Sequence, residues 1–259
     1  MLTSSLLKLS QSHLNLLSLC PSKFQQVYLD CLGSILDPKQ QESMQWGSRF
    51  HLLMQQRELA LPIESLLESD KDLDTSVKDL IKAVPELLQP QPGCWREAEH
   101  CRTLGYKDFV LTVIYDLLVA GKDKAVIFDW KTYRQPQKRN RLASNWQTRL
   151  YLYILVETSE YLPEQIQMTY WFVRSGKPQS LTFTYSQTLH QQTESDLNEL
   201  LANLSTWLQN YQEDKIDFPH KADCEQKCPY FESLAKEVAT PQDSQELLDA
   251  IAEIEEIPI

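Results

Sequence analysis

Two aspartates and a lysine stand inside apolar, strand-like segments in the middle of the chain. Asp116 lies in VIYDLLV, and Asp129 and Lys131 lie in VIFDWKT. Alternate residues of a strand point to the same face, so Asp129 and Lys131 project together. A hairpin between the two segments, turning at 120–123, would bring Asp116 close to Asp129. Carboxylates in apolar strands need compensation for their charge, and where two of them meet a divalent cation is the usual one.

A basic stretch follows Lys131 and leads into a helix. Helical periodicity predicts that helix over 143–156, with Trp146 and Leu150 among its core residues. Gln147 and Tyr151, four residues apart, share a neighbouring face. From 130 to 156 there are six basic residues and no acidic one: Lys131, Arg134, Lys138, Arg139, Arg141 and Arg149.

The pattern D…DxK followed by QxxxY resembles the RecB-type branch of the PD-(D/E)xK nuclease superfamily. The matching residues are Asp116, Asp129, Lys131, Gln147 and Tyr151. Three positions before the first aspartate the family often has Gly, whereas this chain has Val113. The resemblance implies an α/β fold with a restriction-endonuclease-like core, a mixed sheet of about five strands flanked by helices. It also implies that Asp116, Asp129 and Lys131 catalyse phosphodiester hydrolysis, with the two aspartates as ligands of Mg²⁺ or Mn²⁺.

The predicted helix at 42–60 contains Gly47 and His51. A glycine inside a helix costs about 1 kcal/mol relative to alanine, which indicates that Gly47 permits close packing. The pair resembles the G-x-x-x-H helix of the same family, in which the histidine reaches the metal. His51 is therefore expected as a ligand, and a core or solvent-facing histidine is the alternative.

A further ligand is expected from the predicted strand at 94–104. In the family, an acidic residue upstream of the first aspartate often assists at the metal site. Glu97 and Glu99 lie two residues apart and so share one face of the strand. Either could match, and Glu97 is the preferred candidate. An exposed edge-strand carboxylate is the alternative for both.

Three cysteines resemble part of the iron–sulfur motif that many family members carry. Cys20 precedes a proline near the N-terminus, and Cys224 and Cys228 stand near the C-terminus. The last cysteine of the motif, expected near Leu234, is absent. A cluster usually takes four thiolates, so an intact one is not expected. A small buried residue at a helix junction is the alternative for Cys20.

Composition indicates an ordinary globular protein. The 259 residues allow one sizeable domain or at most two small ones. One is expected, over 1–240, as a single RecB-like nuclease domain with a helical insertion at about 61–92. An acidic helix or tail is expected at 241–259. The net charge of −11 restricts any nucleic-acid contact to a local surface. No apolar run or secretory signal is apparent, which favours a cytoplasmic protein that does not contact a membrane.

These observations predict a metal-dependent DNA nuclease of repair, recombination or defence. The resemblance implies that Gln147 and Tyr151 position single strands or duplex ends. No P-loop motif is apparent, so unwinding would need a helicase partner. A catalytically retired DNA-binding or assembly subunit, a merely salt-bridged strand pair and an RNA substrate are the alternatives. Phosphate contacts, which position DNA without reading its sequence, are expected from Arg134, Lys138, Arg139 and Arg141.

Overall fold

The computed structural model describes residues 6–32, 38–68, 70–84, 92–133, 137–174 and 177–221. The chain divides into two compact units, one formed by residues 1–8 and 37–191 and the other by 9–36 and 192–259. The first unit carries the predicted catalytic residues. A single nuclease domain over 1–240 stays a prediction, and the acidic segment at 241–259 lies outside the described residues.

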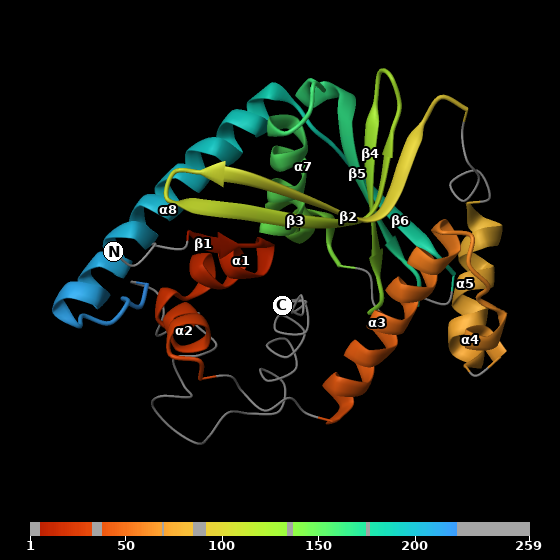
Figure 1. Cartoon of the computed structure of the whole chain (residues 1–259), viewed down its shortest axis with the longest axis horizontal. Coiled ribbons are helices and arrows are strands. Elements are labelled where there is room, and N and C mark those ends of the chain that lie inside the picture. Colours follow the sequence, from red (N-terminus) through yellow and green to blue (C-terminus); the bar gives the residue numbers. More distant parts are fainter. Residues whose placement is uncertain are drawn as a thin grey trace. The chain divides into compact units, whose positions relative to one another are not determined.

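A mixed sheet of six strands forms within the described residues (Figure 1). Its order is β1-β3-β4-β5-β6, and β2 pairs with β3. Strands β4 and β5 run parallel, and the β2–β3, β3–β4 and β5–β6 pairs are antiparallel. The α/β fold with a mixed sheet is confirmed, with one strand more than expected. The strands are β1 (Leu7–Leu9), β2 (Trp95–Tyr106), β3 (Phe109–Ala120), β4 (Ala125–Lys131), β5 (Ile166–Phe172) and β6 (Gln179–Thr184).

The hairpin of β3 and β4 is built from apolar residues with the period of a strand. Along β3, Phe109, Leu111 and Val113 are buried, whereas the residues between them are half-buried. This alternation is expected of a strand with one face against the core and the other face partly open to solvent. A short turn at 121–124 joins β3 to β4, as predicted.

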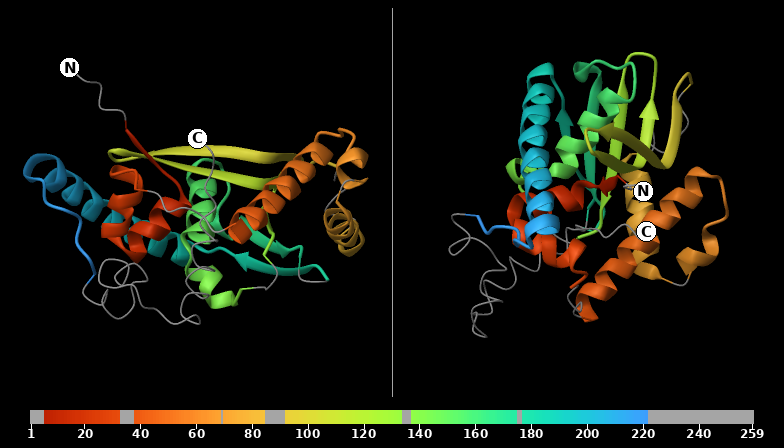
Figure 2. Two further views of the ribbon diagram at one scale, coloured as in Figure 1. Left: turned by 90° about the horizontal axis from the view of Figure 1, so that it is seen from below. Right: turned by 60° about the vertical axis from the view of Figure 1, so that its left-hand side comes forward.

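Three helices before β2 cover one face of the sheet: α3 (Pro38–Glu58), α4 (Glu64–Glu68) and α5 (Lys71–Ala83). They form a core with sheet residues that include Leu117 and Trp130. Within the segment expected as an insertion, the described residues 61–68 and 70–84 contain α4 and α5, and Leu73 and Val77 are buried. Asp70 caps α5, because its Oδ1 accepts hydrogen bonds from two backbone N–H groups of the first turn. Figure 2 shows α3, α4 and α5 from two further directions.

The crossover from β4 to β5 contains α6 (Arg139–Ser144) and α7 (Trp146–Glu157). The sequence predicted one helix over 143–156, and the structure divides it at Asn145. The Asn145 Oδ1 accepts a hydrogen bond of 2.7 Å from the backbone N–H of Gln147 and so begins α7. Helix α7 packs against β2, β3 and β5. A 3₁₀ turn, η2 (Pro163–Gln165), leads into β5.

The second unit contains α1 (Gln11–Leu19), α2 (Pro21–Phe24), a π-helical turn, η1 (Gln25–Leu29), and most of α8 (Gln187–Asp214). Along α8, Leu197, Leu201 and Leu204 are buried, whereas Leu189 in its first turn is 51% exposed. Within the described part of the chain, no helix is both long and apolar enough to cross a membrane.

Candidate active site

The hairpin register places the two aspartates on facing positions. Leu117 pairs with Phe128, and Asp116 and Asp129 occupy the next position of each strand. The regular ladder ends there, and the Asp116 Oδ2 accepts a hydrogen bond of 2.6 Å from the backbone N–H of Trp130. Both aspartates are buried, with Asp129 only 1% exposed. The predicted proximity of the two carboxylates thus follows from the register.

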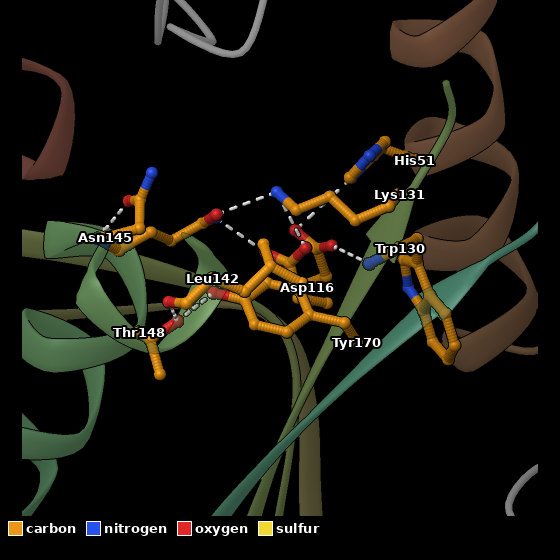
Figure 3. Close-up of polar contacts among 10 residues, drawn as sticks. His51, Asp116, Trp130, Lys131, Leu142, Asn145, Thr148 and Tyr170 are labelled. Atoms are coloured by element: carbon orange, nitrogen blue, oxygen red, sulfur yellow. Dashed lines mark hydrogen bonds and ion pairs between the residues drawn. The ribbon is translucent and has the colours of Figure 1, made fainter. Parts of the chain in front are cut away.

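Lys131, Asp129 and Gln147 form a closed polar network, and Lys131 is labelled in Figure 3. The Lys131 Nζ lies 2.9 Å from the Asp129 Oδ1 and donates a hydrogen bond of 2.7 Å to the Gln147 Oε1. The Gln147 Nε2 donates a hydrogen bond of 2.7 Å to the Asp129 Oδ2. The amide therefore holds the ammonium with one end and the carboxylate with the other. All three side chains are buried, so their mutual geometry is well defined.

His51, Glu99 and Asp116 form a second group of possible metal ligands. One donor atom from each lies within 4.8 Å of the others. The His51 Nδ1 lies 3.3 Å from the Asp116 Oδ1. Two carboxylates and one imidazole are a donor set that suits Mn²⁺ well and Mg²⁺ through the oxygens. The residues present therefore fit a divalent cation at this position.

Of the two glutamates considered, the structure brings Glu99 to this group and not Glu97. Glu97 lies 2.6 Å from the His100 Nδ1, and its side chain is 53% exposed. Glu99 takes the position facing Asp116, because its neighbours Ala98 and His100 pair with Leu117 and Tyr115. Its backbone adopts φ of 51°, a left-handed conformation that is rare for a residue inside a strand. The alternation of the strand alone could not distinguish the two residues.

Gly47 has the packing role that its place inside a helix predicted. A Cβ at this position would lie 2.9 Å from the Thr132 Oγ1, closer than atoms normally approach. Glycine thus lets α3 come close to the end of β4. His51 follows one helical turn later and reaches Asp116.

The structure buries the aromatic ring of Tyr151, which was expected to contact DNA. Tyr151 is 3% exposed, and its ring lies edge-on to Tyr115 at 5.2 Å. Its carbonyl accepts a hydrogen bond from the Tyr115 hydroxyl. In this position Tyr151 packs α7 onto the sheet and offers no exposed ring on which a base could stack.

The predicted phosphate contacts lie around α6. Lys138, Arg139 and Arg141 are exposed, and Arg134 lies outside the described residues. Arg139 donates a hydrogen bond of 2.8 Å to the Thr182 carbonyl and lies over the Phe183 ring at 4.6 Å. Arg139 therefore also ties α6 to β6.

Tyr170 belongs to the site although its sequence position gave no sign of it. Its ring lies 5.3 Å from the Lys131 Nζ, and β4–β5 pairing sets it beside Asp129. Burial, and secondarily the charge of Asp129, raises the pKa of Tyr170, so the phenol stays protonated. The parallel register of β4 and β5 is what brings Tyr170 next to Asp129.

Of the three cysteines that resemble the iron–sulfur motif, Cys20 lies within the described residues. Cys20 is buried, as the alternative interpretation expected, and its Sγ lies 3.9 Å from the His220 Nδ1. Cys224 and Cys228 lie outside the described residues. The absence of an intact cluster stays a prediction.

Comparison with known proteins agrees with this architecture. The model of the PD-(D/E)XK nuclease superfamily matches residues 8–233. The crystal structure of a Eubacterium rectale protein named "Putative exonuclease" has a TM-score of 0.51 at 10% identity, covering 92% of this chain and 91% of that one. A second structure, of SSO0001, has a TM-score of 0.34 at 10% identity, covering 76% and 78%.

No curated protein matches the chain in sequence. The Eubacterium rectale structure supports the fold, which is the expected restriction-endonuclease-like one. The superfamily match spans most of the chain and both compact units. The chain belongs to the PD-(D/E)XK nuclease superfamily.

Proposed function

We propose that this nuclease is a metal-dependent deoxyribonuclease. The observation that carries the proposal is the convergence of Asp116, inside β3, with Asp129 and Lys131, at the end of β4. His51 and Glu99 lie beside Asp116 and complete a donor set for Mg²⁺ or Mn²⁺. A cation held there lowers the pKa of a bound water and neutralises charge on a phosphate.

Lys131 is proposed to stabilise negative charge that develops on the phosphate or the attacking oxygen. A buried ammonium acts strongly in such a role, because little solvent screens it. Gln147 is proposed to orient this ammonium and the Asp129 carboxylate together, since its amide bonds both. This differs from the expected direct contact with the DNA strand end and explains why the chain needs an amide at position 147.

DNA is proposed to approach along α6, where Lys138, Arg139 and Arg141 are exposed. With a net charge of −11, the protein as a whole repels a polyanion, so this basic segment would supply the local attraction. Single strands or duplex ends are the proposed substrates, in repair, recombination or defence, with a helicase as a possible type of partner.

Cleavage assays on single-stranded and double-stranded DNA test the proposal directly. We expect hydrolysis with Mg²⁺ or Mn²⁺, its abolition by EDTA, and a metal-dependent rise in melting temperature. The variant Asp129→Asn should lose hydrolysis while keeping the fold. Wild-type protein that is inert on both DNAs with either metal and shows no melting shift would overturn the enzyme assignment.

One observation favours a second candidate, a retired subunit that only binds DNA or assembles with partners. Asp129 and Lys131 form an ion pair at 2.9 Å, and Gln147 bonds both of them. Such a network can stabilise strands without any cation. DNA binding that persists in EDTA, together with inactivity in every metal, would establish this candidate.

A further inference from the structure

A chain of buried contacts connects Asp129 and Lys131, the proposed catalytic pair, to helix α6, which carries Arg139 and Arg141. The Tyr170 ring lies beside Lys131, and its hydroxyl is 2.7 Å from the Thr148 Oγ1. Thr148 in turn donates a hydrogen bond of 2.6 Å to the carbonyl of Leu142, in the last turn of α6. The Thr148 proton is used by Leu142, so Tyr170 must be the donor to Thr148. Figure 3 shows these residues together.

Helix α6 needs such contacts, because it has only six residues. A helix this short is not stable in isolation, so its position is set by what it touches. Leu142 is its buried residue, whereas Arg139 and Arg141 are exposed. The second tether, from Arg139 to Thr182 and Phe183, reaches the strand that pairs with the one carrying Tyr170. Phe183 itself lies edge-on to Tyr170 at 5.8 Å.

We propose that Thr148 and Tyr170 are positioning residues that hold α6 in register with Asp129 and Lys131. A DNA backbone bound by Arg141 would then present its phosphate to the catalytic pair. The inference rests on the proposed function and adds the element that aligns the substrate. Neither residue is proposed to touch DNA, since both are buried.

The test compares Thr148→Val with Thr148→Ser. Valine keeps the shape and removes the hydroxyl, whereas serine keeps the hydroxyl. We expect Thr148→Val to raise the KM for DNA by about tenfold with kcat changed less than about twofold, since phosphate contacts position the substrate. In EDTA, the slope of the logarithm of the DNA-binding constant against the logarithm of the salt concentration should also fall in magnitude by about one unit for each phosphate contact that is lost. Thr148→Ser should behave as the wild type in both measurements.

A double-mutant cycle that combines Thr148→Val with Arg141→Gln tests whether the two residues act on DNA binding together. If α6 acts through Arg141, Arg141→Gln should weaken DNA binding in the wild type and have little further effect in Thr148→Val. Additive effects would overturn the inference, as would a loss confined to kcat with an unchanged salt slope. Should Thr148→Val fail to fold, Tyr170→Phe, which removes one hydroxyl and keeps the Thr148–Leu142 bond, must show a smaller KM increase of the same kind. Wild-type inactivity would instead refute the proposed function itself.

Discussion

The backbone N–H of Trp130 donates a hydrogen bond of 2.6 Å to the carboxylate of Asp116. The donor belongs to β4 and the acceptor to β3. The last paired residues of the hairpin are Leu117 and Phe128, and Asp116 lies one position beyond Leu117. Asp116 therefore satisfies a buried backbone donor in addition to facing His51 and Glu99. Substitutions of Asp116 can therefore separate its hydrogen bond to the backbone from its proposed role as a metal ligand.

Asp116→Asn and Asp116→Ala should both lose hydrolysis and the metal-dependent melting shift. Only the alanine variant should lose stability, by about 1–3 kcal/mol, because it leaves the Trp130 N–H unpaired while an asparagine oxygen can still accept it. Denaturant unfolding in EDTA measures the difference. Equal stability of the two variants would contradict the structural part of this assignment.

Glu99→Gln and Glu97→Gln form a matched pair of charge removals in one strand. We expect Glu99→Gln to weaken Mn²⁺ binding by about tenfold or more, equivalent to about 1.4 kcal/mol, because Glu99 lies with His51 and Asp116. Glu97→Gln should bind Mn²⁺ as the wild type does, since Glu97 faces His100. Titration calorimetry measures the Mn²⁺ affinity of both variants. A larger loss of affinity in Glu97→Gln than in Glu99→Gln would show that Glu97 is the ligand.

Lys131→Met should separate hydrolysis from metal binding. The lysine is no metal ligand, so Mn²⁺ affinity should persist or rise slightly, whereas hydrolysis should fall by about 10²-fold or more through loss of an electrostatic stabiliser. Gln147→Ala should be milder, because it removes two hydrogen bonds and no charge. Single-turnover rates and metal titrations on the same samples decide the point. A Lys131→Met variant that no longer binds metal would contradict it.

Gly47→Ala should disturb the end of β4 through Thr132. The new Cβ would lie 2.9 Å from the Thr132 Oγ1, an overpacking that costs about 1–3 kcal/mol against a gain in helix propensity of about 1 kcal/mol. Adding Thr132→Ala removes the clashing oxygen and leaves only a Cβ contact at 3.7 Å. The double variant should thus recover stability and activity together. Additive losses in this cycle would show that Gly47 serves another purpose.

Arg141→Gln should weaken binding to all DNA sequences alike and lower the salt slope by close to one unit. Lys122→Gln is the control, an equally exposed charge in the turn before β4. That turn and Lys131 stand at opposite ends of a strand that rises about 3.3 Å per residue, so Lys122 lies far along the strand from the site. Fluorescence anisotropy across a salt series reports both slopes. Equal effects of the two changes would place the DNA elsewhere.

The hairpin and its carboxylates could be predicted because alternation and burial pattern are local properties. Buried carboxylates are costly unless a positive charge compensates them, and the pairing of the two strands brings Asp116 to the position facing Asp129, which lies beside Lys131. The close approach at Gly47 was equally readable, since glycine inside a helix needs a packing reason. The break at Asn145 was missed although asparagine is a common N-cap, because the apolar period runs through it.

Other features depend on tertiary structure. The choice between Glu97 and Glu99 is set by backbone geometry at one residue, and strand spacing treats both alike. Tyr170 meets Lys131 only because β5 runs parallel to β4 after a helical crossover. The burial of Tyr151 likewise follows from how α7 lies on the sheet, whereas the family resemblance implied a contact with DNA.

At position 99, the left-handed backbone conformation favours glycine, whereas the proposed metal site requires a carboxylate. Glycine would adopt φ of 51° without the penalty of about 1–2 kcal/mol that other residues incur. It would also remove the carboxylate from beside His51 and Asp116. Selection for stability alone would favour glycine here, so the presence of glutamate supports the proposed role of its carboxylate as a metal ligand. In a stability screen, Glu99→Gly is therefore the substitution that improves the scaffold and disables the enzyme.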